Sequence, residues 1–295
     1  MKNLTFMALL AVSLAGCNSA KKTNTSSEEQ AFSSYALNEL WSTDTVLLTC
    51  ESVLYDQNGD LLYVACINGN PSEKDGNGFI SVLEPDGTIR SLEWVTGLNA
   101  PKGMGVFGNK LYVTDIDVLV VIDIEQAGIS ERIPVEGASF LNDVAVSTDG
   151  KVYFSDSDTG NLWIYSDGEL TPWITEGLER PNGLYVEKDR VLLTSSGSQD
   201  LRVIDRSSAE METVTTGIGA GDGVEFTGNE GYYLTSSWAG EVFLIYPDYS
   251  KVSLLKTSDR EINSADIGFN REDQVLYVPT FFDNRVVAYK LEKEK

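Results

Sequence analysis

The sequence predicts an all-β fold: a six-bladed β-propeller closed by an N-terminal strand that completes the last blade. Three observations predict it. A unit of roughly 40 residues recurs six times, each unit contains short apolar segments rich in β-formers, and polar turns such as Asp-Gly separate the segments. Four short strands in a unit of this length are typical of a propeller blade packed face to face on its neighbours.

The chain begins with a segment that predicts a signal peptide, residues 1–16, rather than a membrane span. Lys2 precedes an apolar run of about a dozen residues, which is too short to cross a bilayer. Leu14–Cys17 resembles a bacterial lipobox, and this implies cleavage before Cys17 and lipidation of its thiol. An ordinary secretory signal with a coincidental cysteine is the alternative. Residues 17–31 are polar without periodicity and predict a flexible tether before a propeller at 32–295.

The first strand of each unit is apolar and most of these strands open on a polar residue. The predicted first strands are Glu51–Tyr55, Lys102–Val106, Asn142–Val146, Asn182–Val186, Asp222–Phe226 and Ala265–Phe269. Their starts lie 51, 40, 40, 40 and 43 residues apart. The first interval is longer because of Asn68–Gly78, a Gly- and Asn-rich insertion that predicts a loop on one face.

Second and third strands follow across turns. The predicted second strands are Leu61–Ala65, Lys110–Thr114, Lys151–Asp156, Arg190–Ser195, Gly231–Ser236 and Gln274–Thr280. The predicted third strands are Phe79–Leu83, Val118–Ile124, Asn161–Tyr165, Leu201–Asp205, Glu241–Tyr246 and Arg285–Lys290. A fourth segment follows in the first five units only. The unmatched N-terminal segment Tyr35–Trp41 is therefore expected to supply the fourth strand of the sixth blade and to remove an open sheet edge.

The starts of the first strands are expected to form a ring around the central tunnel. In order, these positions hold Glu51, Lys102, Asn142, Asn182, Asp222 and Ala265. Two carboxylates and two amides among them suit a hard divalent cation such as calcium, which prefers oxygen ligands. The alternative is that these Asn and Asp residues only form turns that lead into the strands. We favour the metal site because these oxygen-bearing side chains occur at the same position of four repeats.

Four phrases of the sequence carry a family resemblance. They are Glu51–Asp56, Leu141–Val146, Arg180–Leu184 and Gly221–Val224. In this order and blade phase they resemble the family of gluconolactonase, regucalcin (senescence marker protein) and luciferin-regenerating enzyme, over about residues 50–290. The resemblance implies a six-bladed propeller with a divalent cation, commonly calcium, in its tunnel.

The resemblance also implies roles for individual residues. Glu51, Asn182 and Asp222 match direct metal ligands, and Asn142 matches an Asn that contacts the metal or the substrate. Related enzymes hydrolyse lactones or organophosphates, with the residue that matches Asp222 as base or nucleophile. A bound cation polarises the carbonyl or phosphoryl oxygen while the carboxylate activates water or attacks.

The chain departs from this family at positions that bear on substrate. By this resemblance, sugar lactonases have an Arg at the position of Phe140, so gluconolactone is not the expected substrate. The chain contains no His, which excludes the histidines of related phosphotriesterases, a Ser-His-Asp triad and a His-ligated zinc. Lys102, Phe140 and Trp238 are the candidate substrate-binding residues. Weaker candidates at the tunnel mouth are Asp115, Asp156, Ser195, Ser236, Phe281 and Phe282.

Charge and cysteine content limit the possible partners. The net charge of −23 disfavours nucleic acid, so a small-molecule substrate or ligand is expected, with the membrane contacted only through the lipid anchor. Cys50 and Cys66 flank a predicted hairpin, and either a disulfide or two buried thiols fits the sequence.

Together with the oxygen-bearing ring, the resemblance implies a calcium-dependent hydrolase of a lactone or other small ester, with Asp222 as base or nucleophile. The alternative is a non-catalytic ligand-binding propeller of the cell envelope, in which calcium is structural. The lipobox-like segment predicts a lipid-anchored protein of the bacterial cell envelope. Asn18 stands where an Asp would suggest inner-membrane retention, so the periplasmic face of the outer membrane is expected in a cell with two membranes.

Overall fold

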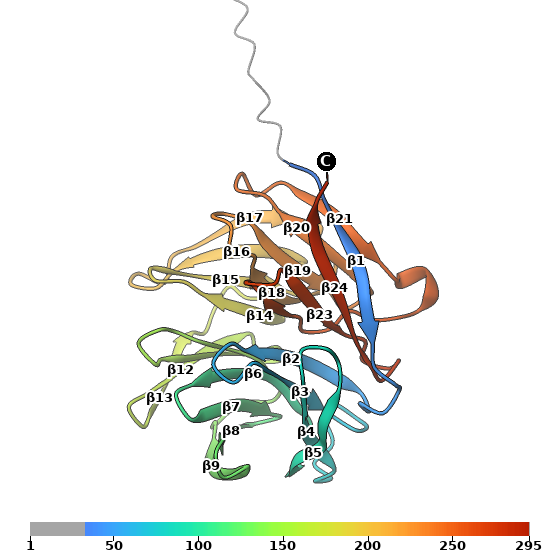
Figure 1. Ribbon diagram of the computed structural model, residues 1–295. Coiled ribbons are helices and arrows are strands. Elements are labelled where there is room, and N and C mark those ends of the chain that lie inside the picture. Colours follow the sequence, from blue (N-terminus) through green and yellow to red (C-terminus); the bar gives the residue numbers. More distant parts are fainter. Residues whose placement is uncertain (1–32, 295) are drawn as a thin grey trace, which may run out of the picture. The chain divides into compact units, whose positions relative to one another are not determined.

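Strands make up nearly all of the regular structure of this protein, and the computed structural model, which describes residues 33–294, confirms the six-bladed β-propeller. Six four-stranded antiparallel blades form a ring (Figure 1). The expected signal peptide, Cys17 and the tether lie outside the described residues. Within residues 33–294, no helix has the length and apolarity needed to cross a membrane.

The first five blades each run in chain order from the inner to the outer strand. Blade 1 contains β2 (Cys50–Asp56), β3 (Leu61–Cys66), β4 (Gly78–Leu83) and β5 (Ile89–Leu98). Blade 2 contains β6 (Pro101–Phe107), β7 (Lys110–Asp115), β8 (Val118–Asp123) and β9 (Gly128–Pro134). Blade 3 contains β10 (Leu141–Val146), β11 (Val152–Asp156), β12 (Asn161–Ser166) and β13 (Glu169–Ile174).

The fourth and fifth blades repeat the pattern. Blade 4 contains β14 (Pro181–Val186), β15 (Arg190–Ser195), β16 (Asp200–Asp205) and β17 (Met211–Thr216). Blade 5 contains β18 (Gly221–Phe226), β19 (Tyr233–Ser237), β20 (Glu241–Ile245) and β21 (Lys251–Lys256). A 3₁₀-helix, η1 (Ser258–Arg260), follows blade 5. Residues 68–77 of the predicted insertion after β3 lie outside the strands, and its last residue, Gly78, is the first residue of β4.

Blade 6 joins the two ends of the domain, as the sequence predicts. It contains β22 (Gly268–Asn270), β23 (Val275–Pro279), β24 (Val286–Lys293) and, at its outer edge, β1 (Tyr35–Ser42). β1 runs antiparallel to β24 over its whole length, from the pair Tyr35–Lys293 to the pair Ser42–Val287. The first described strand therefore closes the ring through backbone hydrogen bonds.

The largest error in a predicted strand start, three residues, is in the first strand of blade 6, whereas the other starts differ by no more than two residues. The expected strand Ala265–Phe269 begins only at Gly268. The preceding residue Asp266 instead pairs with the neighbouring blade, because its backbone N–H donates to Glu51 O at 2.9 Å and its carbonyl accepts from Val53 N at 3.1 Å. These bonds connect blade 6 to blade 1 beside the tunnel.

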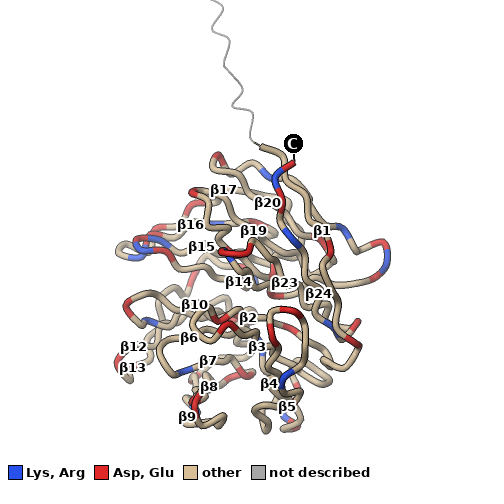
Figure 2. Tube along the Cα trace, in the orientation of Figure 1, with Lys and Arg blue, Asp and Glu red and all other residues tan. Residues whose placement is uncertain are grey.

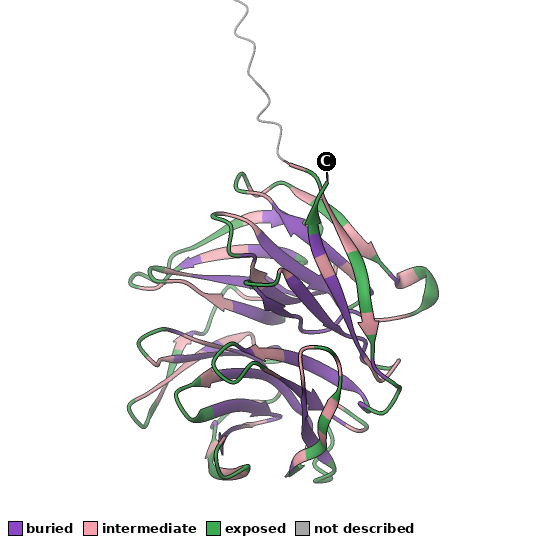
Figure 3. Ribbon diagram, in the orientation of Figure 1, coloured by how far each residue is buried: buried purple, intermediate pink, exposed green. Residues whose placement is uncertain are grey.

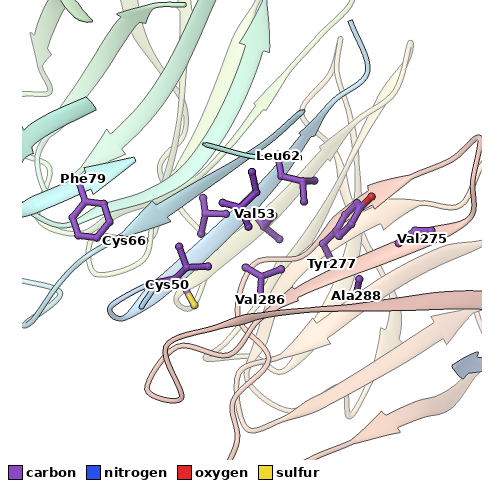
Figure 4. Packing of buried hydrophobic residues seen from close by; sticks show 12 residues of the cluster. Cys50, Val53, Leu62, Cys66, Phe79, Val275, Tyr277, Val286 and Ala288 are labelled. Carbon is purple, nitrogen blue, oxygen red and sulfur yellow. The ribbon is translucent and has the colours of Figure 1, made fainter. Parts of the chain in front are cut away.

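The hydrophobic core lies between the blades. Six clusters of buried side chains each fill the space between one blade and the next. Between blades 6 and 1, Val53 and Leu62 face Tyr277 and Val286 (Figure 4). Inner strands are buried and outer strands are more exposed (Figure 3). Blade-to-blade packing thus holds the inner strands in place around the tunnel.

Candidate functional site

Breaks in strand register occur at the tunnel positions that the sequence singles out. In five blades, the register between the first and second strands is interrupted at the ring position. Regular pairing stops at the residue before the ring residue and resumes one or two residues after it. The residues within these irregularities include Glu51, Lys102, Asn142, Asn182 and Asp222. A bulge turns a side chain away from the regular alternation of a strand. The repeated irregularity therefore gives the ring residues a common local geometry.

Glycines beside the ring residues let the inner strands approach one another closely. A Cβ on Gly183 would lie 1.8 Å from the carbonyl oxygen of Asp222 in the next blade. A Cβ on Gly103 would lie 2.4 Å from the Cα of Asp143, and one on Gly223 would lie 2.6 Å from Ile267 N. Only glycine fits at these three contacts without a shift of the backbone.

Hydroxyl groups near the ends of second strands fix the backbone of the following blade. Thr194 Oγ1 donates to Asp222 O at 2.9 Å, and Ser236 Oγ donates to Ala265 O at 2.7 Å. Thr114 Oγ1 donates to Asn142 O. This role was not predicted for these hydroxyls. Their signal in the sequence is the recurrence of Ser or Thr near the end of the second strand in blades 2 to 5, one blade before the ring residue that they support.

All four predicted metal-binding residues line one cavity of about 310 Å³, and so do all three predicted substrate-binding residues. The metal-binding set is Glu51, Asn142, Asn182 and Asp222, and the substrate-binding set is Lys102, Phe140 and Trp238. The four oxygen-bearing side chains come from four different blades and each belongs to a residue no more than 7% exposed. The structure thus brings together residues that are up to 171 positions apart in the chain (222 − 51).

Two oxygen atoms in this group lack a hydrogen-bond partner. Asn182 Nδ2 donates to Asp222 Oδ1 at 3.1 Å, but Asn182 Oδ1 accepts no hydrogen bond from the described residues. Glu51 Oε2 is likewise buried without a donor among residues 33–294. Asn142 Nδ2 donates to Ser157 Oγ at 3.0 Å, which fixes the orientation of its amide. Buried acceptors without donors are costly in a folded protein.

The cavity concentrates negative charge in a dry environment. Burial raises the pKa of Glu51 well above its usual range, with a further contribution from Asp222. Burial likewise raises the pKa of Asp222 well above its usual value, and the charge of Asp266 adds to this effect. Acidic residues also occur throughout the blades (Figure 2). A cation between the two carboxylates would favour their ionised forms.

Lys102 is the basic residue of the predicted ring, and it is 1% exposed. Its ammonium group donates to Ala100 O at 3.0 Å and lies 4.3 Å from the centroid of the Phe140 ring. Burial lowers the pKa of Lys102 to about 8, and the charge of Glu51 opposes that shift. Lys102 therefore offsets part of the acidic charge, but its described contacts are with a carbonyl and an aromatic face.

A second layer of acids lies next to the ring. Asp143 Oδ2 accepts from Leu184 N at 2.5 Å, and Asp266 Oδ2 accepts from Ser52 Oγ at 2.5 Å. Burial raises the pKa of Asp143 well above its usual value and that of Asp266 to about 7. Neither residue was predicted to belong to the site, although each directly follows a ring position.

The donor chemistry of the ring fits a hard cation. No group of three or more His, Cys, Asp or Glu side chains within residues 33–294 is arranged to hold a metal. A metal in the ring would therefore need amide oxygens besides the two carboxylates, and Asn182 Oδ1 and Glu51 Oε2 are the buried oxygens without donors. Oxygen-only donors of mixed carboxylate and amide type suit calcium better than a softer metal.

The weaker candidates at the tunnel mouth separate into two groups. Asp115 accepts from the backbone of Asn99 and Ala100, and Asp156 accepts from that of Ser139 and Phe140, so both carboxylates hold loops. Ser236 binds backbone as described above. Ser195 Oγ is buried without a partner among the described residues, and it does not line the cavity. The second group, Phe281 and Phe282, does line it.

The two cysteines of the described chain are buried free thiols. Cys50 and Cys66 are cross-strand neighbours in β2 and β3, but Cys50 Sγ donates to Arg285 O at 3.1 Å while Cys66 Sγ lies 3.8 Å from Ser81 Oγ. Burial raises the pKa of Cys50 to about 12. Of the two alternatives, the structure shows the pair of buried thiols.

Comparison with solved structures identifies similar propellers. A gluconolactonase from Xanthomonas campestris matches with a TM-score of 0.63 at 14% identity, over 86% of this chain and 87% of that chain. A streptogramin B lyase matches with a TM-score of 0.63 at 11% identity, over 88% and 98% of the two chains. A catalytically inactive His-to-Ala variant of virginiamycin B lyase from Staphylococcus aureus, with quinupristin, matches with a TM-score of 0.59 at 13% identity, over 88% and 100%.

Sequence comparisons add no closer relative. No protein-family model matches the chain, and no curated protein matches it. At 11–14% identity, the structural likeness shows the propeller fold and does not transfer an activity.

Proposed function

We propose that this protein is a calcium-dependent hydrolase of a lactone or other small ester, with Asp222 as base or nucleophile. The observation that carries the proposal is the pair of buried oxygens without donors, Glu51 Oε2 and Asn182 Oδ1, in a cavity that also contains Asp222. Such oxygens are expected where a cation completes the site. Calcium is the cation proposed, although another hard divalent ion has the same ligand preference.

The proposed ligands are Glu51, Asn142, Asn182 and Asp222. Calcium would polarise the ester carbonyl and stabilise the negative charge that develops on its oxygen. Asn182 Nδ2 holds Asp222 Oδ1, which fixes the carboxylate so that its second oxygen can accept a proton from water or attack the carbonyl carbon. Ser157 positions Asn142, because its hydroxyl accepts from the amide and donates to Pro181 O at 2.6 Å.

The fold comparison supports lactone hydrolysis more than elimination. One structural neighbour is a gluconolactonase. Two further neighbours are a streptogramin B lyase and a virginiamycin B lyase, and the catalytically inactive variant of the latter has Ala in place of a histidine. The present chain contains no His, so a mechanism that needs an imidazole is closed to it. Phe140 occupies the position at which sugar lactonases have Arg, so we do not propose gluconolactone as the substrate.

A non-catalytic ligand-binding propeller with a structural calcium is the second candidate. It is favoured by the links that the tunnel residues make between blades, such as the hydrogen bond from Asn182 in blade 4 to Asp222 in blade 5. A metal bound to residues of four blades would cross-link the ring even without catalysis.

The proposed location is the bacterial cell envelope, with a lipid on Cys17 and the domain at the periplasmic face of the outer membrane. The lipid anchor is proposed from the lipobox-like residues Leu14–Cys17, and the outer membrane from Asn18, which stands where an Asp would suggest inner-membrane retention. Labelling with a fatty-acid analogue that persists in Cys17→Ser would contradict it. The net charge of −23 supports a small-molecule partner and argues against nucleic acid.

Calcium titration and hydrolysis assays on chelator-stripped protein test the function. We expect calcium to raise the melting temperature of the wild type and to be required for turnover of a lactone and aryl-ester panel. Asp222→Asn should lower kcat by about a hundredfold or more, and Glu51→Gln should weaken calcium binding. Asp44→Asn and Glu136→Gln, at exposed positions, are the matched controls.

The outcomes separate the candidates. Calcium binding without turnover of any ester would support the ligand-binding propeller. No calcium binding at all would remove the basis of both proposals and would leave the Asn and Asp residues of the ring as turn formers.

A further inference from the structure

An aromatic wall lines the candidate site at the tunnel mouth. We define it as Trp238, Phe281 and Phe282, all of which line the same cavity as Glu51 and Asp222. We propose that this wall selects esters or lactones with an apolar arm, aryl or alkyl, and that Trp238 and Phe282 determine that preference. This inference rests on the proposed function, since it concerns the substrate of the same site.

The three rings form one edge-to-face cluster. The centroids of Phe281 and Phe282 lie 4.7 Å apart at an interplanar angle of 88°. Trp238 lies 5.6 Å from Phe281 at 76° and 6.1 Å from Phe282 at 80°. Such packing orients aromatic rings relative to one another. Trp238 and Phe282 remain partly exposed, so a planar or hydrocarbon group can contact these two rings without a rearrangement of the cluster.

Backbone contacts hold the wall beside the predicted metal ligands. Phe281 N donates to Cys50 O at 3.2 Å, and the two residues form an isolated antiparallel bridge. Cys50 directly precedes Glu51, so the bridge places Phe281 next to the start of the ring. Trp238 N donates to Ala220 O at 2.8 Å, two residues before Asp222. The wall is thus connected to the backbone near both acidic ring residues.

Phe281 adopts an unfavourable backbone conformation to reach this position. Its φ is +53°, in the left-handed region that a bulky residue seldom occupies. Backbone strain of this kind persists only where surrounding contacts enforce it, and it is common at functional sites. The three rings differ in exposure: Phe281 is 6% exposed, Trp238 is 38% exposed and Phe282 is 62% exposed.

Other apolar groups line the same cavity. Ile67, Pro71 and Phe140 all contribute to it. The ammonium of Lys102 also lines the cavity, where it lies over the Phe140 ring and donates to Ala100 O. Arg180, which is paired with Asp158 at 2.8 Å, and Ser196 complete the polar part of the lining. The site therefore offers carboxylate and amide oxygens at one part and mainly carbon surface elsewhere. An ester with an apolar arm matches both parts.

Paired substrates test the preference. The pair is γ-phenyl-γ-butyrolactone and unsubstituted γ-butyrolactone, assayed with calcium on the wild type, Trp238→Ala and Phe282→Ala. We expect the wild type to prefer the phenyl lactone by at least about tenfold in kcat/KM, because hydrophobic pockets discriminate by roughly 10- to 200-fold. Each of the two variants should reduce this ratio severalfold, mainly through KM. An alkyl series should gain about fourfold for each methylene that reaches the wall.

Phe107→Ala is the matched control. Phe107 is also an exposed aromatic residue, at 44%, but it belongs to β6 and does not line the cavity. Its variant should keep the wild-type ratio. Circular dichroism of each variant checks that the fold is retained.

Calorimetric binding of the same two lactones separates failure of this inference from failure of the proposed function. If neither lactone is hydrolysed but the phenyl lactone binds and Phe282→Ala abolishes that binding, the apolar site stands and the hydrolase does not. If both lactones are hydrolysed with a ratio near one, or the ratio is the same in Phe282→Ala, the inference fails and the hydrolase stands. A wild-type dimer that Phe282→Ser converts to a monomer would assign the wall to self-association and overturn the inference.

Discussion

At the scale of single residues, the tunnel is dominated by carboxyl groups whose charge is disfavoured by burial. Glu51, Asp143, Asp222 and Asp266 all have a raised pKa for this reason. A raised pKa means that ionisation costs folding free energy unless a cation or hydrogen-bond donors compensate for it. The free energy of unfolding of the domain is therefore expected to depend on the predicted metal.

Glu225 gives a separate pH dependence outside the predicted ligand set. Burial raises its pKa to about 8 from an ordinary 4.5, although Arg271 opposes the shift from 3.8 Å. Because the folded-state pKa lies above the unfolded value, the contribution of Glu225 to stability is complete below pH about 4.5 and is lost as the pH rises to about 8. We expect Glu225→Gln to remove this loss.

Urea unfolding of the wild type and Glu225→Gln between pH 5 and 8 measures the difference. The wild type should lose on the order of 1 kcal/mol of stability per pH unit relative to the variant in this window. Glu136→Gln, at an exposed position, is the control and should follow the wild type. Parallel pH profiles for the wild type and Glu225→Gln would show that Glu225 titrates as an ordinary surface acid.

At the scale of the secondary-structure elements, the inner strands are specialised for close approach. The register shift places the ring residue, and the glycine that follows it in three blades leaves room for the backbone of the next blade. Regular alternation alone would neither place these side chains together nor bring the strands so near. The site geometry is therefore a property of neighbouring inner strands.

Gly183→Ala tests this close approach. Its Cβ would overlap the carbonyl oxygen of Asp222, so we expect a loss of at least about 2 kcal/mol in the free energy of unfolding. The calcium-induced rise in melting temperature should also shrink, because Asp222 must move. Gly128→Ala is the matched control: its nearest neighbour would be 3.7 Å away, so the change should be neutral or stabilising by about 0.4–1 kcal/mol. Equal effects of the two substitutions would contradict the role given to Gly183.

At the scale of the whole domain, ring closure depends on the pairing of β1 with β24. β1 contributes Leu37 to the core between blades 5 and 6 and Trp41 to the core between blades 6 and 1. Trp41 Nε1 also donates to Pro85 O in blade 1, at 3.1 Å. One strand therefore covers the edge of blade 6 and contacts two neighbouring blades.

Deletion of residues 33–42 should weaken the whole ring. The loss of partly buried Leu37 and Trp41 is expected to cost about 3–5 kcal/mol, which lowers the melting temperature by roughly 10 °C or more. The uncovered edge of β24 should promote association between chains. Calorimetry and light scattering measure both effects, with Leu40→Ser, at a 53% exposed position, as the control. An unchanged melting temperature would mean that five complete blades and three strands suffice for closure.

The sequence by itself determined the fold and most of the residues that line the cavity. The 40-residue repeat fixes the number of blades, and the unmatched segment Tyr35–Trp41 fixes the closing strand, because each blade has to bury its faces on its neighbours. The phase of Glu51, Asn142, Asn182 and Asp222 in the repeat places them at one ring, since equivalent positions of a propeller face its axis.

Only the tertiary structure decided what those residues contact. The partners of Asn182 and Asp222 belong to different blades, as do the hydroxyl bonds of Thr194 and the bridge between Phe281 and Cys50. Such contacts depend on the angle and spacing between blades, which local periodicity does not encode. The late start of β22 has the same origin, because Asp266 pairs across the interface with blade 1 rather than within its own blade.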